Sequence, residues 1–130
     1  MTLEALREAV DRYGSVTFFL TAGADGRPHT VQLPVTWTET GRIVLHPGNS
    51  TVANVQARPL VTLLWPPIEP GGYSLIVDAT VVEASAAGHG DNAVSVQPTK
   101  AVLHRPAPPA NPAAAACGSD CVGVFAAPKA

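Results

Sequence analysis

The residues best suited to chemistry are three small polar side chains, Asn49, Ser50 and Thr51, which follow a Pro-Gly break at residues 47–48. Asn49 or Ser50 can cap a short helix over residues 51–57. A helix N-terminus offers free backbone N–H groups and the positive end of the helix dipole, and the hydroxyls add donors. The pattern predicts a pocket for an anionic group, although an ordinary helix cap uses the same residue types.

Cationic and aromatic residues elsewhere in the chain are further candidates. Arg58 stands at the end of the predicted helix, where it can reach an anionic ligand or a C-terminal carbonyl of the helix. Trp37 and Trp65 end two predicted strands, so each can stack against a planar cofactor or pack in the core. Lys100 and Arg105 lie in the last long strand, either as contacts for an anion or as surface charges.

The sequence shows no metal-binding motif. The four histidines, at positions 29, 46, 89 and 104, have none of the short spacings that metal sites use. Cys117 and Cys121 are too few for a structural zinc site, which needs about four ligands. We interpret them as thiols or an adventitious disulfide in a C-terminal tail.

The elements around these residues are mostly strands. A helix is expected over residues 2–13, capped by Thr2, with Leu3, Leu6 and Val10 on one face. Asp25-Gly26 is a hairpin-turn signal. The expected strands cover residues 15–21, 29–38, 42–46, 60–65, 73–84 and 93–105, the fourth buried on both faces and the last broken by Pro98. Short strands joined by tight turns predict a closed or partly closed barrel.

Composition narrows the class of protein. The 130 residues fit one domain, with 46% hydrophobic and 14% charged residues. Eight Lys and Arg form no run, which argues against a nucleic-acid partner. No apolar run is long enough to span a membrane, and no secretory signal is visible, so we expect a cytoplasmic protein. Residues 1–106 form the predicted domain, and 107–130 a Pro/Ala-rich tail.

Four stretches, in this order, resemble the pyridoxamine 5′-phosphate oxidase-like split β-barrel family. They are residues 22–29 (AGADGRPH), 33–37 (LPVTW), 49–64 and 96–102 (VQPTKAV), and the resemblance covers about residues 3–105. It implies a mostly β fold: a six-stranded antiparallel split β-barrel with an N-terminal helix and one short helix.

The resemblance also implies a homodimer that binds FMN, or less favourably a deazaflavin, in a cleft between subunits and transfers hydride to or from a small organic molecule. Ser50 and Thr51 stand where the family usually has Lys or Arg, and Asp78 where it often has Gly. A cofactor-free barrel that binds a small ligand or a protein is therefore the alternative. The cofactor-binding residues expected on this basis are Pro34, Val35, Thr36, Asn49, Ser50, Thr51, Arg58, Trp65 and Lys100.

Overall fold

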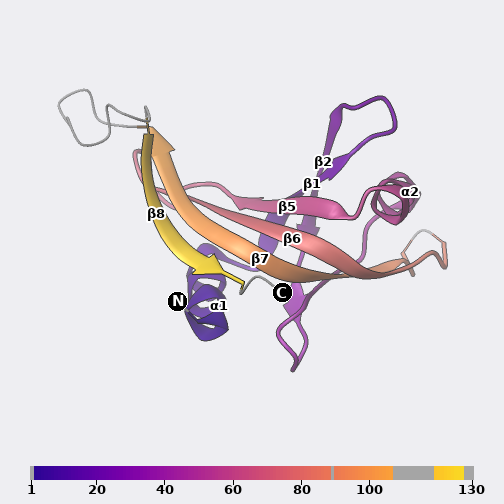
Figure 1. The fold of residues 1–130 in the computed structure, drawn as a ribbon, viewed down its shortest axis with the longest axis horizontal. Coiled ribbons are helices and arrows are strands. Elements are labelled where there is room, and N and C mark those ends of the chain that lie inside the picture. Colours follow the sequence, from indigo (N-terminus) through magenta and orange to yellow (C-terminus); the bar gives the residue numbers. More distant parts are fainter. Residues whose placement is uncertain (1, 89, 107–118, 128–130) are drawn as a thin grey trace.

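A computed structural model describes residues 2–88, 90–106 and 119–127 of the chain. Two helices and eight strands make up the fold (Figure 1). The helices are α1 (Leu3–Tyr13) and α2 (Asn49–Ala57). The strands are β1 (Val16–Ala22), β2 (Pro28–Pro34), β3 (Thr36–Trp37), β4 (Ile43–Leu45), β5 (Leu60–Trp65), β6 (Ser74–Ser85), β7 (Ala93–Pro106) and β8 (Ser119–Ala126).

All eight strands belong to one antiparallel sheet, in the order β2-β1-β5-β6-β7-β4-β3, with β8 paired to the second half of β7. The sheet curls into a half-barrel (Figure 1), which confirms the mostly β, split-barrel prediction. The strand number was underestimated by two. One extra strand arises because Pro34 ends β2 and the Val35 N–H donates to Ser15 O, which separates β3 from β2. The other is β8, which lies within the predicted tail.

Both helix predictions need only small changes. Thr2 caps α1 by accepting the Ala5 N–H, and Gly14 ends the helix at φ 109°. The second helix starts two residues earlier than expected. Gly48 is its N-cap and no side chain caps it, so Asn49 and Ser50 are helical residues rather than caps.

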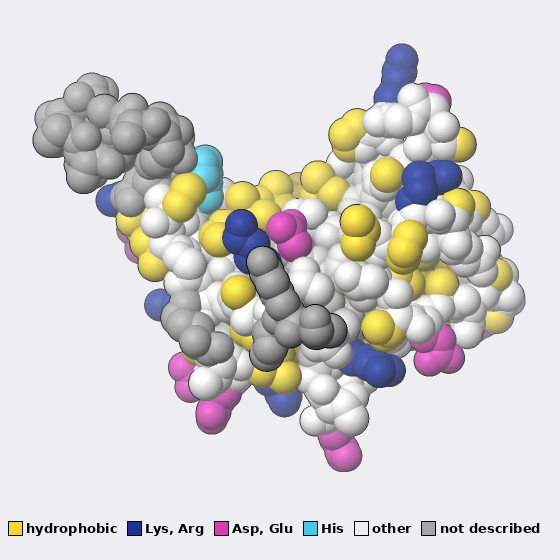
Figure 2. Space-filling model, viewed as in Figure 1, with side chains coloured by type: hydrophobic (Ala, Val, Ile, Leu, Met, Phe, Trp, Pro, Cys, Tyr) yellow, Lys and Arg dark blue, Asp and Glu magenta, His cyan; other side chains and the backbone are white. Residues whose placement is uncertain are grey.

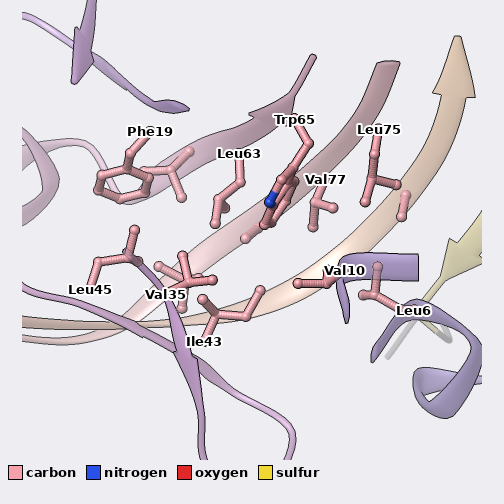
Figure 3. Close-up of a cluster of buried hydrophobic side chains, with 14 of the residues drawn as sticks. Leu6, Val10, Phe19, Val35, Ile43, Leu45, Leu63, Trp65, Leu75 and Val77 are labelled. Carbon is pink, nitrogen blue, oxygen red and sulfur yellow. The ribbon is translucent and has the colours of Figure 1, made fainter. Parts of the chain in front are cut away.

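The core lies inside the curl of the sheet (Figure 3), and both α1 and α2 contribute buried residues to it. Leu6 and Val10 of α1 face Leu75 and Val77 of β6, and Trp65 and Leu63 continue the cluster toward Phe19. The prediction that the strand at 60–65 is buried on both faces is wrong. Val61, Leu63 and Trp65 enter the core, whereas Leu60 is 73% exposed and Thr62 and Leu64 are half-buried on the opposite face.

The break predicted at Pro98 is also absent, because β7 runs continuously from Ala93 to Pro106. A register shift absorbs the irregularity: Asp78 pairs with Lys100 and Ala79 pairs with Pro98, which leaves Thr99 as the extra residue of a bulge. No helix among the described residues is long and apolar enough to cross a membrane. The cytoplasmic location stays a prediction.

Candidate functional site

The first turn of α2 presents backbone N–H groups that have no backbone partner among the described residues. The first α-helical hydrogen bond runs from the Val52 N–H to Gly48 O, so the amides of residues 49–51 precede the helical pattern. Gly48 contributes no capping side chain, Ser50 is exposed, and Thr51 is 2% exposed. The residues of this turn, 49–52, include no acidic or basic side chain. The turn can therefore bind an anion through amides and the Ser50 hydroxyl, without a cation of its own.

Asn92, which the sequence analysis did not single out, fixes this turn to the rest of the chain. Its side chain is fully buried and donates from Nδ2 to Pro47 O and Asn49 Oδ1, both at 3.0 Å. Its Oδ1 accepts the N–H groups of Ala87 and Gly88, also at 3.0 Å. One side chain thus joins the segment before α2 to the loop between β6 and β7.

A histidine adds a fifth contact to the Asn92 network. His46 Nδ1 lies 3.0 Å from the backbone oxygen of Asn92. The start of α2 is therefore held by the side chain and the backbone of one asparagine. An Asn beside Asp91 indicates a turn. Its partners at the start of α2, Pro47 and Asn49, lie 45 and 43 residues away, so no local pattern reveals them.

Arg58 lies at the opposite end of α2, as its C-cap residue. Its Nε donates to Ala22 O at 2.7 Å, and one terminal nitrogen lies 3.5 Å from Asn54 Oδ1. Asn54 in turn donates to the Thr21 hydroxyl. These contacts join the end of α2 to the end of β1, so the guanidinium already has partners within the chain.

The other predicted cofactor residues occupy separate places. Pro34 and Thr36 are exposed, while Val35 is buried and lines a cavity of about 140 Å³ beside Trp37 and α1. Trp65 is 1% exposed, lies inside the core and donates from Nε1 to Gly14 O at 2.9 Å. Lys100 is exposed on β7 and lines another cavity, of about 270 Å³, with residues of β8.

The face of the sheet opposite the core carries two rows of aligned side chains. The strand register places Phe18, Leu64, Ile76 and Val102 in one line across β1, β5, β6 and β7, which we call the apolar row. The next line runs through Leu20, Thr62, Asp78 and Lys100. Figure 2 shows hydrophobic side chains gathered in the hollow between the β1–β2 hairpin and the β7–β8 end.

Metal chemistry finds no support in the described part of the chain. No group of three or more His, Cys, Asp or Glu side chains gathers there in a metal-binding arrangement. Cys121 is an exposed residue of β8. Cys117, the other cysteine of the predicted tail, lies outside the described residues.

Sequence comparison finds relatives of unassigned function. The chain is 50% identical over 84 residues to an uncharacterised protein of Mycobacterium tuberculosis, and equally to one of Mycobacterium bovis. The match covers 62% of this chain and 58% of each relative, so the chain spans less than two thirds of their length. No family model matches the sequence.

Several solved structures share the fold. A putative pyridoxamine 5′-phosphate oxidase from Listeria innocua has a TM-score of 0.60 at 14% identity, over 78% of this chain and 98% of that one. An FMN-binding protein related to this oxidase, from Nostoc punctiforme, has a TM-score of 0.55 at 8% identity, over 94% and 93%. An F420 reductase has a TM-score of 0.54 at 15% identity, over 66% and 87%.

The resemblance found in the sequence is thus confirmed at the level of the fold. The chain has the split β-barrel fold of the pyridoxamine 5′-phosphate oxidase-related proteins, a fold that also occurs in an F420 reductase. Because a fold can support unrelated functions, the activity has to be argued from the residues of the site.

Proposed function

We propose that this chain binds a flavin-type cofactor, FMN foremost, in a cleft between two copies of itself, as an oxidoreductase of small organic molecules. Two observations support the proposal: the fold is shared with an FMN-binding protein, and the first turn of α2 leaves its amides open. Bound FMN would supply the hydride-transfer chemistry. The chain would supply binding, orientation and exclusion of water.

The open turn of α2 fits the phosphate end of the cofactor. The amides of residues 49–51 and the exposed Ser50 hydroxyl are donors, and an anion at a helix N-terminus is stabilised by the helix dipole. Asn92 would hold Asn49 in place beneath the phosphate through the 3.0 Å hydrogen bond. A deazaflavin with an acidic tail needs more basic surface than this turn offers, which places FMN first.

The apolar row is the surface we assign to the second copy. Phe18, Leu64, Ile76 and Val102 are only half-buried, and Val16 beside them is 45% exposed. A contiguous apolar surface of this kind is typical of interaction sites, since monomeric proteins seldom leave one uncovered. In this arrangement Lys100, in the adjacent row, faces the cleft between the copies.

The phosphate assignment is tested by adding the missing cation. Ser50→Lys should tighten FMN binding by about tenfold or more, because a charge-assisted hydrogen bond contributes about 1.5–3 kcal/mol. FMN, riboflavin and a deazaflavin are titrated by fluorescence quenching, and riboflavin, which lacks the phosphate, should gain nothing from the substitution. Gln56→Lys is the matched control, because it adds the same charge at an exposed position in the last turn of the same helix, and it should leave the FMN affinity unchanged. Equal FMN affinity of Ser50→Lys and wild type would contradict the assignment.

The second candidate is a cofactor-free barrel that binds a small ligand or a protein. It is favoured by the absence of any basic residue in the first turn of α2 and by the carboxylate of Asp78 on the face beside the apolar row. A colourless protein that shows no saturable binding of FMN or deazaflavin would establish this candidate over the first.

A further inference from the structure

A further cavity lies at the end of the sheet where the β1–β2 hairpin turns, near the C-terminal rather than the N-terminal end of α2. Its volume is about 480 Å³. None of the predicted cofactor residues contributes to its wall. The wall is built by β1, the hairpin, β5, β6 and the bulge of β7, from Leu20, Thr21, Ala22, Gly26, Pro28, Leu60, Val61, Thr62, Asp78, Ala79 and Thr99.

Most of this wall is apolar, and its single charged side chain is Asp78. Leu60 is 73% exposed although it lines the cavity, so apolar surface faces the opening. A hydrophobic wall with a few fixed polar groups is the usual composition of a small-ligand site.

The two threonine hydroxyls beside Asp78 each donate their only proton to an oxygen of Asp78. Thr62 Oγ1 donates to Asp78 Oδ1 at 3.0 Å, and Thr99 Oγ1 donates to the Asp78 backbone oxygen at 3.1 Å. A threonine hydroxyl has one proton and two lone pairs, so both retain only acceptor capacity toward the cavity. The fourth polar side chain of the wall, Thr21, is 4% exposed and bonded to Asn54.

The cation on the neighbouring strand does not cancel the charge of Asp78. Lys100 is its register partner on β7, yet the two side chains form no ion pair among the described residues. Lys100 contributes to the neighbouring cavity on the β8 side instead. The carboxylate therefore keeps one oxygen, Oδ2, for a ligand.

We propose that this cavity binds a small organic cation, with a protonated amine on Asp78 and the hydroxyl oxygens of Thr62 and Thr99, and an apolar body against Leu20, Pro28 and Leu60. An ammonium group is donor-only and positively charged, which matches a wall that offers acceptors and one carboxylate. A phosphate or carboxylate ligand would meet repulsion there. No residue of α2 lines the cavity, so the inference can be tested without FMN. Leu20, Thr62 and Asp78 belong to the row that contains Lys100, so the proposed dimer would place its second copy beside this cavity.

Three probes of one shape test the charge preference: phenethylamine, phenethyl alcohol and phenylacetate. Each is titrated into the full-length chain without FMN, by calorimetry and by amide chemical shifts. Phenethylamine should bind saturably and perturb the amides of Thr62, Asp78 and Thr99. Phenylacetate should bind at least about tenfold more weakly, since it loses the charge-assisted contact.

Asp78→Asn removes the charge and keeps the shape. Because Asp78 is exposed, the substitution should lower the affinity for phenethylamine by about two- to fivefold. Glu83→Gln is the matched control: it removes one carboxylate from the same strand, outside the cavity, and should leave the affinity unchanged. No saturable phenethylamine binding, equal binding of phenylacetate, or unchanged affinity in Asp78→Asn would each overturn the inference. FMN titration of the same Asp78→Asn protein keeps the outcome separate from that of the flavin proposal.

Discussion

Substitution of Asn92 by alanine should destabilise the chain far more than its single side chain suggests. The side chain makes four hydrogen bonds, to Ala87, Gly88, Pro47 and Asn49, and it is fully buried. A net contribution of about 0.5–1.5 kcal/mol for each gives a range of about 2–6 kcal/mol. Ala87 and Gly88 lie in an exposed loop where water can replace Asn92, so we expect about 3 kcal/mol.

The measurement is urea denaturation followed by circular dichroism, with hydrogen exchange at the amides of Ala87 and Gly88. Asn49→Ala is the control, because it removes one member of the same network at an exposed position and should cost less than about 1 kcal/mol. The exchange of both amides should accelerate in Asn92→Ala and stay unchanged in Asn49→Ala. A loss below about 1 kcal/mol for Asn92→Ala, or equal losses for both variants, would refute the role we assign to this network.

Two further predictions concern aromatic and apolar residues. Trp65→Phe should lower the free energy of unfolding by about 1–3 kcal/mol, because it leaves Gly14 O without its donor. Trp37→Phe should lower it less, since the buried Nε1 of Trp37 has no hydrogen-bond partner among the described residues. Urea denaturation compares the two variants, and a larger loss of stability in Trp37→Phe would contradict this expectation. Ile76→Asp should convert a dimer into monomers in sedimentation experiments, because it places a charge in the apolar row, while Thr40→Asp in the exposed turn between β3 and β4 should not. A wild-type monomer would reject the dimer proposal directly.

Much of the fold could be predicted from local signals. The Thr2 cap and the i, i+3, i+7 apolar face define α1, and Asp25-Gly26 defines the first hairpin, with Gly26 at φ 85°. These features depend on capping and turn interactions between residues that are close in the sequence. The division of residues 29–38 into β2 and β3 depends instead on the Val35–Ser15 hydrogen bond, a contact across 20 residues.

The candidate sites were harder to predict from the sequence, because their side chains come together only in the folded sheet. Asn92 reaches the start of α2 across more than 40 residues, and Thr99 meets Asp78 across 21 through the bulge of β7. The anion site at the helix start stays a prediction. Its cap was misassigned because Asn and Ser are strongly preferred as cap residues, whereas the observed cap, Gly48, has no side chain. Gly48 occupies the N-cap position with an extended backbone, at ψ 176°, which is the usual conformation of an N-cap residue.

The one-sided burial of the apolar strand Leu60–Trp65 has a physical explanation that also bears on function. The run Leu60–Trp65 is nearly all apolar, which is typical of a strand covered on both faces, yet only alternate residues enter the core. A strand with one solvated face normally alternates with polar residues, and Leu64 in the apolar row breaks that rule together with Phe18, Ile76 and Val102. In the described part of the chain these four side chains are only half-buried, so the fold of one copy leaves part of this apolar surface uncovered. The proposed second copy would cover the strand on the face that the core leaves open.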